Sequence, residues 1–172
     1  MLLLLGTVAP AMLLGCAADG SHARTDSPEM AAYVQLVMPA QIKILEWTKP
    51  VSLAADGNAD GVEAVLEARD SFDDLTKVVG TLHFELRTRR LSDRMGTRVA
   101  FWPVEINSVE TMRMYRDPLS RFYRFPLQLD QGPLKPGRYA LMVWLLLPTG
   151  QRLLDEYEFQ YDGAAAPPAS SF

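Results

Sequence analysis

The sequence predicts an all-β protein built as a single antiparallel β-sandwich of seven or eight strands. Residues 81–87 indicate it most clearly, because apolar and polar side chains alternate there as in a strand with one face in a core. Residues 125–129 and 156–162 repeat the alternation. Glycine and proline turns separate such segments at short intervals, which is typical of antiparallel sandwiches.

The expected strands follow one another along the chain with few helical signals between them. Pro103 indicates that its strand lies at an edge or contains a bulge. Residues 139–147 are apolar nearly throughout, which predicts a central strand covered on both faces, and residues 148–150 form a turn into the next strand. Residues 108–116 could form one or two helical turns. In chain order the expected strands are 41–47, 62–68, 81–87, 98–106, 125–129, 139–147, 152–154 and 156–162.

The length of 172 residues fits one domain, which we expect to comprise residues 31–162 with an immunoglobulin-like or transthyretin-like topology. Residues 163–172 contain few core-forming side chains, which predicts a disordered tail. The net charge is −4 with acids and bases interspersed, so nucleic acid is not an expected partner. We expect a monomer. The arginines at 87, 89, 90 and 94 are expected at a solvated strand end.

The first residues of the chain resemble an export signal. Residues 2–14 form an apolar run of the length found in signal peptides and too short to span a membrane. The run ends in Leu13-Leu14-Gly15-Cys16, which resembles the lipobox of bacterial lipoproteins. In that family the signal is cleaved before the cysteine and the cysteine is acylated. The resemblance implies a signal peptide over 1–15, lipid on Cys16 and a flexible tether over 16–30.

Two further features of this segment bear on the anchor. No lysine or arginine precedes His22, although signal peptides normally begin with a positive region. The alternatives to a lipoprotein are an ordinary cleaved signal with a chance cysteine and an uncleaved anchor. Ala17 follows the cysteine in place of the aspartate associated with retention at the inner membrane, which favours the outer membrane facing the periplasm.

A second resemblance is carried by short motifs: residues 41–44, the Asp-Gly loop that begins at Asp56, residues 80–82, Phe101-Trp102 and residues 123–125. With these motifs the domain resembles an uncharacterised group of bacterial lipoproteins with one such sandwich. The resemblance covers most of the mature chain. It implies a location and a fold but no activity.

One loop has the spacing of a calcium-binding EF-hand loop. Hard cations prefer oxygen ligands, and alternate carboxylate and amide side chains can supply them. The candidate ligands are Asp56, Asn58, Asp60, the carbonyl of Val62 and Glu67. The alternative is a polar turn, since Asp, Asn and Gly are common in any exposed connection. If residues 62–68 are a strand, Glu67 lies about 20 Å beyond Gly61 and cannot reach the ion. Residues 70–74 are then a second turn at the opposite end of that strand.

The sequence contains neither a GxSxG elbow nor a phosphate-binding glycine loop, and its single cysteine is assigned to lipid. Trp47, Trp102 and Trp144 could line a sugar platform, but core positions are expected, most firmly for Trp144. His83 is expected to be exposed.

We therefore expect a non-catalytic binding or structural module of the cell envelope that contacts protein or polysaccharide and needs no cofactor, with Ca²⁺ as the possible exception. The alternatives are a calcium-dependent version of this module and an envelope hydrolase with a carboxylate pair.

Overall fold

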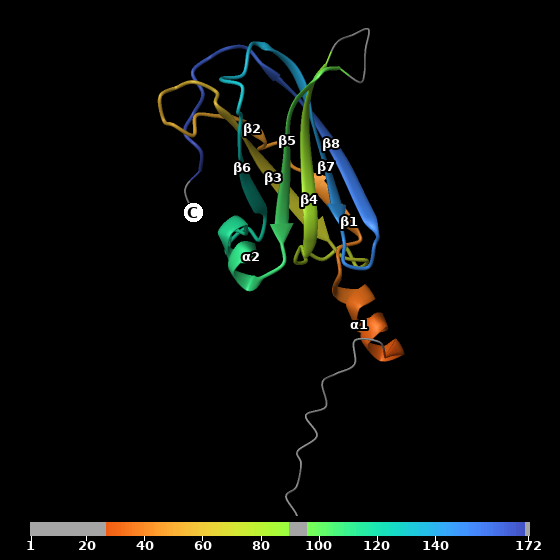
Figure 1. Ribbon diagram of the computed structural model, residues 1–172. Coiled ribbons are helices and arrows are strands. Elements are labelled where there is room, and N and C mark those ends of the chain that lie inside the picture. Colours follow the sequence, from red (N-terminus) through yellow and green to blue (C-terminus); the bar gives the residue numbers. More distant parts are fainter. Residues whose placement is uncertain (1–26, 90–95, 171–172) are drawn as a thin grey trace, which may run out of the picture.

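The chain folds into two antiparallel four-stranded sheets that face each other (Figure 1), in a computed structural model that describes residues 27–89 and 96–170. One sheet has β3 at its centre, with β6 on one side and both β1 and β2 on the other. The second sheet has the order β5-β4-β7-β8. The predicted all-β sandwich is confirmed, whereas the choice between the two named topologies stays a prediction. The strands are β1 (Gln41–Ile44), β2 (Lys49–Val51), β3 (Gly61–Arg69), β4 (Gly80–Thr88), β5 (Arg98–Ile106), β6 (Tyr123–Gln128), β7 (Gly137–Leu146) and β8 (Arg152–Tyr161).

β1 and β2 are two halves of one interrupted edge strand. Both pair with β3, at Gln41–Ile44 and at Lys49–Val51. Thr48 bridges the gap between them, because its hydroxyl accepts a hydrogen bond from Val65 N at 2.9 Å. The expected strand 41–47 therefore ends early, and a buried threonine side chain takes the place of the backbone pairing there.

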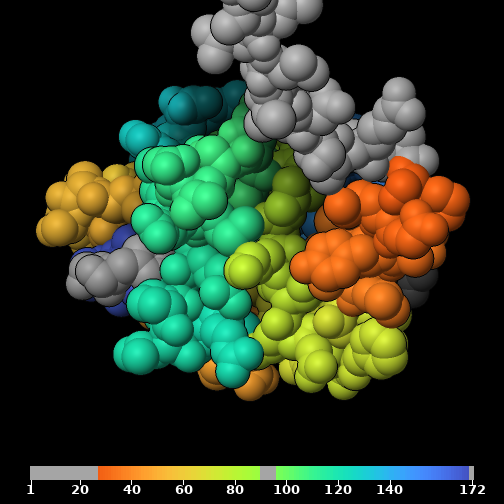
Figure 2. Space-filling view, turned by 90° about the horizontal axis from the view of Figure 1, so that it is seen from below, coloured from red at the N-terminus to blue at the C-terminus, as the bar shows by residue number. Residues whose placement is uncertain are grey.

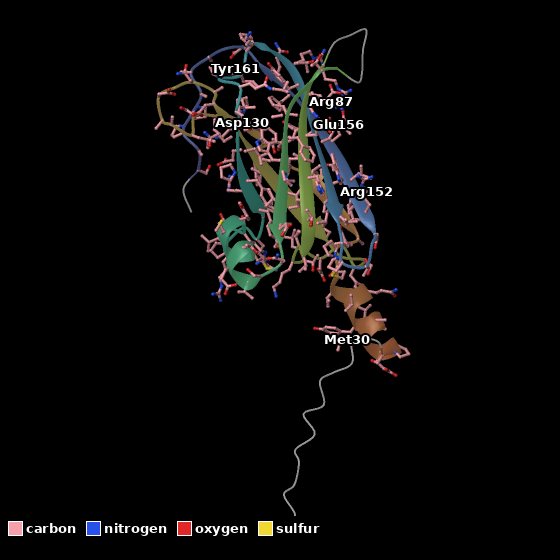
Figure 3. The ribbon with its side chains drawn as sticks, viewed as in Figure 1. Met30, Arg87, Asp130, Arg152, Glu156 and Tyr161 are labelled. Carbon is pink, nitrogen blue, oxygen red and sulfur yellow. The ribbon has the colours of Figure 1, made fainter. Side chains whose placement is uncertain are left out.

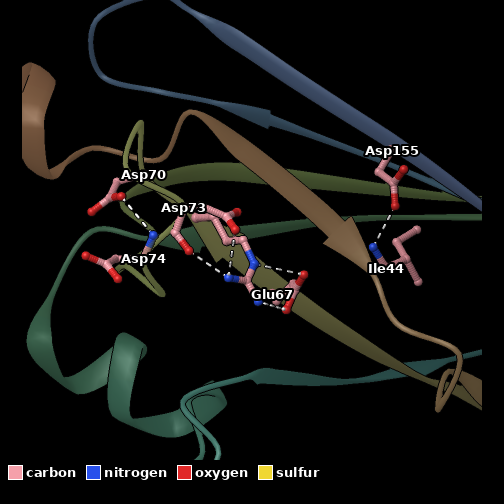
Figure 4. Close-up of polar contacts among 7 residues, drawn as sticks. Ile44, Glu67, Asp70, Asp73, Asp74 and Asp155 are labelled. Carbon is pink, nitrogen blue, oxygen red and sulfur yellow. Dashed lines mark hydrogen bonds and ion pairs between the residues drawn. The ribbon is translucent and has the colours of Figure 1, made fainter.

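The core lies between the sheets, where alternate side chains of the strands meet. Phe84 of β4 and Phe125 of β6 are fully buried, with ring centroids 4.9 Å apart. Trp102 of β5 donates from Nε1 to the carbonyl of Gln128 in β6 at 2.6 Å and so ties one edge of the sandwich together. At the opposite edge, Asp155 of β8 accepts a hydrogen bond from the backbone N–H of Ile44 at 2.6 Å (Figure 4).

The half-buried position of Asp155 predicts that the stability of the fold depends on pH. Burial raises the pKa of this carboxyl above its usual value, so the fold favours its protonated form. Stability is therefore lost as pH rises from the unfolded pKa through the raised folded pKa, and stays lower above it.

Asp155→Asn keeps an acceptor for Ile44 N without the charge. In urea titrations from pH 3 to 7 we expect its stability relative to wild type to increase with pH. Asp155→Ala should be about 1–3 kcal/mol less stable than Asp155→Asn, because it leaves a backbone N–H unpaired. An unchanged pH profile in Asp155→Asn would contradict this.

Two helices lie at one end of the sandwich, α1 (Pro28–Val37) and α2 (Val109–Tyr115) (Figure 1). α2 confirms a helical segment within 108–116, and a capping box of Ser108 and Thr111 begins it. α1 was not expected, and it extends across the boundary placed at residue 30. Its start has ordinary signals: Ser27 accepts a hydrogen bond from Met30 N at 3.1 Å, and Pro28 occupies the first turn.

The C-terminal tail is ordered over residues 163–170, so the prediction of a disordered tail is wrong for them. Pro168 forms a parallel bridge with Ser52, and Ser52 N donates to Pro167 O at 2.8 Å. Ser170 donates from its backbone N and its hydroxyl to the buried Glu63 carboxylate, at 2.7 and 2.9 Å. The tail is held by backbone pairing and by this carboxylate, which composition does not reveal.

Candidate functional site

The loop of the expected calcium site is stabilised by its own carboxylates. Asp56 accepts hydrogen bonds from Asn58 N, Asn58 Nδ2 and the Ser52 hydroxyl, at 2.9, 2.9 and 3.1 Å. The bond from Asn58 N is the main reason why the pKa of Asp56 is lowered. Asp60 accepts from Leu53 N at 2.5 Å and Ala54 N at 3.0 Å. The side chains of Asp56 and Asn58 meet, whereas the Asp60 carboxylate turns to the backbone of Leu53 and Ala54. These contacts are those of a hydrogen-bonded turn.

The last two expected ligands do not join this loop. Val62 and Glu67 lie in β3, which is extended from Gly61 to Arg69, so Glu67 is about 20 Å along the chain from Gly61. Its carboxylate binds Arg69 at 3.2 Å (Figure 4). The EF-hand ligand set is therefore not assembled. Across residues 27–89 and 96–170, no group of three or more His, Cys, Asp or Glu side chains is placed to hold a metal ion.

The second acidic group is a turn at the other end of β3, as predicted. Asp70 Oδ1 accepts from Phe72 N at 2.9 Å and Asp74 N at 3.1 Å (Figure 4). Asp73 lies 3.7 Å from the Arg69 guanidinium. These carboxylates therefore organise their own loop.

The most distinctive side-chain group lies on the outer face of the second sheet. Each strand of that sheet contributes one residue: Phe101 from β5, His83 from β4, Trp144 from β7 and Arg152 from β8. His83 stacks on Trp144 with centroids 5.3 Å apart and planes inclined by 11°. Phe101 lies 5.8 Å from both rings. Arg152 places its guanidinium 5.3 Å from the Trp144 ring centre, a cation–π contact.

This arrangement corrects two expectations. Trp144 was expected in the core, but β7 directs Leu141, Val143 and Leu145 inward and Trp144 outward. β7 does have strands on both sides, so it is central within its sheet, yet its outer face is only partly covered. His83 was expected to be exposed, but it is half-buried between two aromatic rings, and its Nδ1 has no partner among the described residues.

The aromatic group is partly exposed and has exposed apolar neighbours. Phe101 is 41% exposed and Leu154, which pairs with Trp144 across β7 and β8, is 59% exposed. A shallow cavity of about 480 Å³ is lined by His83, Phe101, Trp144, Leu146, Gly150 and Arg152. We call the set Phe101, His83, Trp144, Arg152, Leu146 and Leu154 the aromatic patch.

The other half of the same face is charged (Figure 3). Arg87 pairs with Glu85, and Arg89 pairs with Glu156 and, at 2.8 Å, with Glu158. Arg87 and Arg89 are thus engaged in ion pairs and are not simply solvated, whereas Arg90 and Arg94 lie outside the described residues. The sheet therefore presents an apolar half next to an ion-paired half.

The three tryptophans do not form one platform. Trp102 joins the two sheets, and Trp144 lies on the outer face of the second sheet. Trp47 is exposed beside the first sheet, 5.6 Å from the Phe122 ring. A sugar platform built from all three is not present, and only Trp144 belongs to the aromatic patch.

The buried carboxylates are paired with arginines. Glu63 binds Arg124 at 3.3 Å, and Glu67 and Glu85 bind Arg69 and Arg87. Glu63 and Glu67 share one face of β3, four residues apart, which separates them by about 13 Å. Carboxylate pairs that hydrolyse glycosides lie about 5–9.5 Å apart. These two side chains therefore do not have that geometry.

No family model, no curated protein and no solved structure matches this chain. Neither helix of the described segments is both long and apolar enough to cross a membrane. Cys16, the expected site of lipid attachment, lies outside the described residues.

Proposed function

We propose that the chain is a non-catalytic binding module of the bacterial cell envelope, lipid-anchored through Cys16 and facing the periplasm from the outer membrane. The aromatic patch is its contact surface for an envelope polysaccharide or protein. The observation that carries the proposal is the exposure of this patch on a sheet face. A soluble domain normally buries such side chains, and aromatic residues and arginine are enriched at the centres of interfaces.

The chemistry of the patch suits a ligand with both apolar and polar surface. Trp144, Phe101 and His83 supply ring surface held by mutual stacking, which costs little conformational entropy on binding. Arg152 supplies donors next to the rings, and its contact with Trp144 orients it beforehand. The anchor of this proposal is the resemblance of Leu13–Cys16 to a lipobox, which the sequence alone supports.

Binding to cell-wall sacculi tests the contact surface. The lipidated protein, in detergent, is expected to sediment with purified sacculi. Leu154→Ser should weaken this binding about tenfold, the effect of losing about 1.4 kcal/mol at an interface centre. Leu119→Ser is the matched control, because Leu119 is 92% exposed but lies in the loop after α2 rather than on the patch.

If the partner is a protein, a photoreactive residue at position 154 should crosslink to it in intact cells, and one at position 119 should not give the same product. The absence of both sacculus binding and a crosslink specific to position 154 would contradict the proposed contact surface.

A further inference from the structure

Exposed apolar side chains gather at the end of the sandwich where the described chain begins. This end is formed by α1, the loop 70–79 between β3 and β4, and α2 with the loop 116–122 that follows it (Figures 1 and 2). Among the described residues, seven of the eleven exposed large hydrophobic side chains belong to these elements. They are Tyr33, Leu36, Val37, Phe72, Val109, Met114 and Leu119.

α1 shows most clearly that this end is incompletely covered. Its sequence, PEMAAYVQLV, contains a single charged residue, Glu29, and yet none of its residues is buried. A helix that is apolar nearly all round is normally buried in a core or in lipid. One side-chain contact, from the Thr76 hydroxyl to Val37 O at 2.7 Å, ties its end to the sandwich. The apolar surface of α1 is therefore available for contact with another apolar environment.

A basic groove lies among these apolar side chains. Its volume is about 380 Å³, and it is lined by Lys77, Val109, Met112, Arg113, Arg116 and Pro118. None of the ion pairs found among the described residues involves its three cations. Arg116 stacks over Tyr123 at 5.9 Å, and its Nε has no hydrogen-bond partner among the described residues.

Three of the acidic residues at this end are occupied within their own loops. Asp70 caps its turn, Asp73 faces Arg69, and Asp117 accepts from Leu119 N and Ser120 N at 2.7 and 3.0 Å. They fix the loops that carry Phe72 and Leu119. No carboxylate is among the described residues that line the groove, while Glu110 of α2 has its pKa lowered chiefly by hydrogen bonding at the helix start and further by the charge of Arg113. The groove therefore complements an anion, and its apolar border complements acyl chains.

The covalent distance to Cys16 brings this end close to the membrane. Eleven peptide units connect Cys16 to Ser27, so the two can be at most about 40 Å apart. Ser27 adjoins α1, at the apolar end. If Cys16 carries lipid, as the proposed function has it, the tether joins the domain at the end with the exposed apolar side chains and the basic groove.

We propose that this end is a membrane-contacting surface, in which α1, Phe72 and Leu119 enter the interfacial region and Lys77, Arg113 and Arg116 bind the phosphate of an anionic phospholipid. The inference rests on the proposed lipid anchor. The surface fixes the orientation of the sandwich and holds the aromatic patch, on a sheet face that rises from this end, at a defined angle to the bilayer.

Fluorescence in vesicles tests the inference. The lipidated protein is reconstituted in vesicles of phosphatidylethanolamine and phosphatidylglycerol with a nitroxide on the acyl chains. Leu119→Cys supplies a thiol for an environment-sensitive fluorophore, because Cys16 is the only native cysteine and lipidation consumes its sulfur. Gln131→Cys, exposed in the connection between β6 and β7 at the opposite end, is the matched control.

We expect a blue-shifted emission and quenching by the nitroxide lipid at position 119 and neither at position 131. In vesicles that contain phosphatidylglycerol, the double variant Lys77→Gln/Arg113→Gln should reduce the quenching to the level that the unsubstituted surface shows in vesicles without phosphatidylglycerol. Equal water exposure at both positions, with Cys16 lipidated, would overturn the membrane-contacting surface and leave the anchor intact. Labelling of Cys16 itself would show a free thiol and refute the anchor.

Discussion

Cys16→Ser is expected to abolish lipidation of the chain completely. The hydroxyl is not a substrate for the thioether-forming acylation that a lipobox directs, so cleavage before residue 16 should fail as well. Metabolic labelling with a palmitate analogue should fall to background, and the accumulated chain should retain residues 1–15. Because one acyl chain gives only marginal binding and several hold a protein stably, loss of lipid removes the stable anchor.

Ala18→Ser is the matched control for this change, since it adds a hydroxyl two residues beyond the cysteine and outside the segment Leu13–Cys16 that resembles a lipobox. It should be labelled as strongly as the wild type. Equal labelling of Cys16→Ser and wild type would mean that any lipid is attached elsewhere, and would contradict the assignment of Cys16.

Gly80→Ala is expected to destabilise the sandwich by about 2–5 kcal/mol. Gly80 begins β4 with φ +133°, in a region that L side chains rarely adopt. A Cβ there would lie 2.2 Å from the backbone carbonyl oxygen of Leu146, in the paired strand β7. Backbone within a ladder cannot move aside cheaply, so strain and overpacking add. Urea unfolding should show the loss as a lowered midpoint.

Gly132→Ala separates the two causes of this loss. Gly132 also has a positive φ, +86°, but a Cβ there meets no atom within 4 Å. We expect it to cost about 1 kcal/mol, the strain of the backbone conformation alone. Similar losses for the two variants would mean that the close approach of Gly80 to Leu146 is not what constrains β4.

The strict alternation of apolar and polar residues was sufficient to predict several strands and which of their side chains point inward. Leu82, Phe84 and Leu86 of β4 are fully buried, as expected, and Tyr157 and Phe159 of β8 are half-buried against the core. Alternation works for these strands because one face meets water and the other meets the opposite sheet. The order of the strands depends on contacts between distant segments, and so it had to come from the structure.

Trp144 shows where the pattern fails. Both faces of β7 are apolar in sequence, which is also the signature of a strand covered on both sides. Here the outward residues Met142, Trp144 and Leu146 belong to an exposed or half-exposed face beside His83 and Arg152. An exposed apolar contact surface and a second buried face have the same sequence pattern, so only the structure separates them.

The sequence of the Asp56 loop could not decide between a calcium site and a polar turn. Its residues satisfy both a cation-ligand spacing and the needs of a tight turn, and the difference lies in the conformation of residues 62–67. Pairing of β3 with β1, β2 and β6 keeps those residues extended. The start of α1 did carry a local signal, Ser27-Pro28-Glu29, of the kind that begins helices. Residues 31–37 lack the polar face that an amphipathic helix would show.

The intact mass of the mature protein, purified from bacterial membranes, tests the account most directly. The account predicts a chain that begins at Cys16 and carries the added mass of a diacylglycerol and an amide-linked acyl chain. A chain with an unmodified Cys16, whether it begins there or farther upstream, would contradict the lipid anchor and with it the orientation inferred for the sandwich.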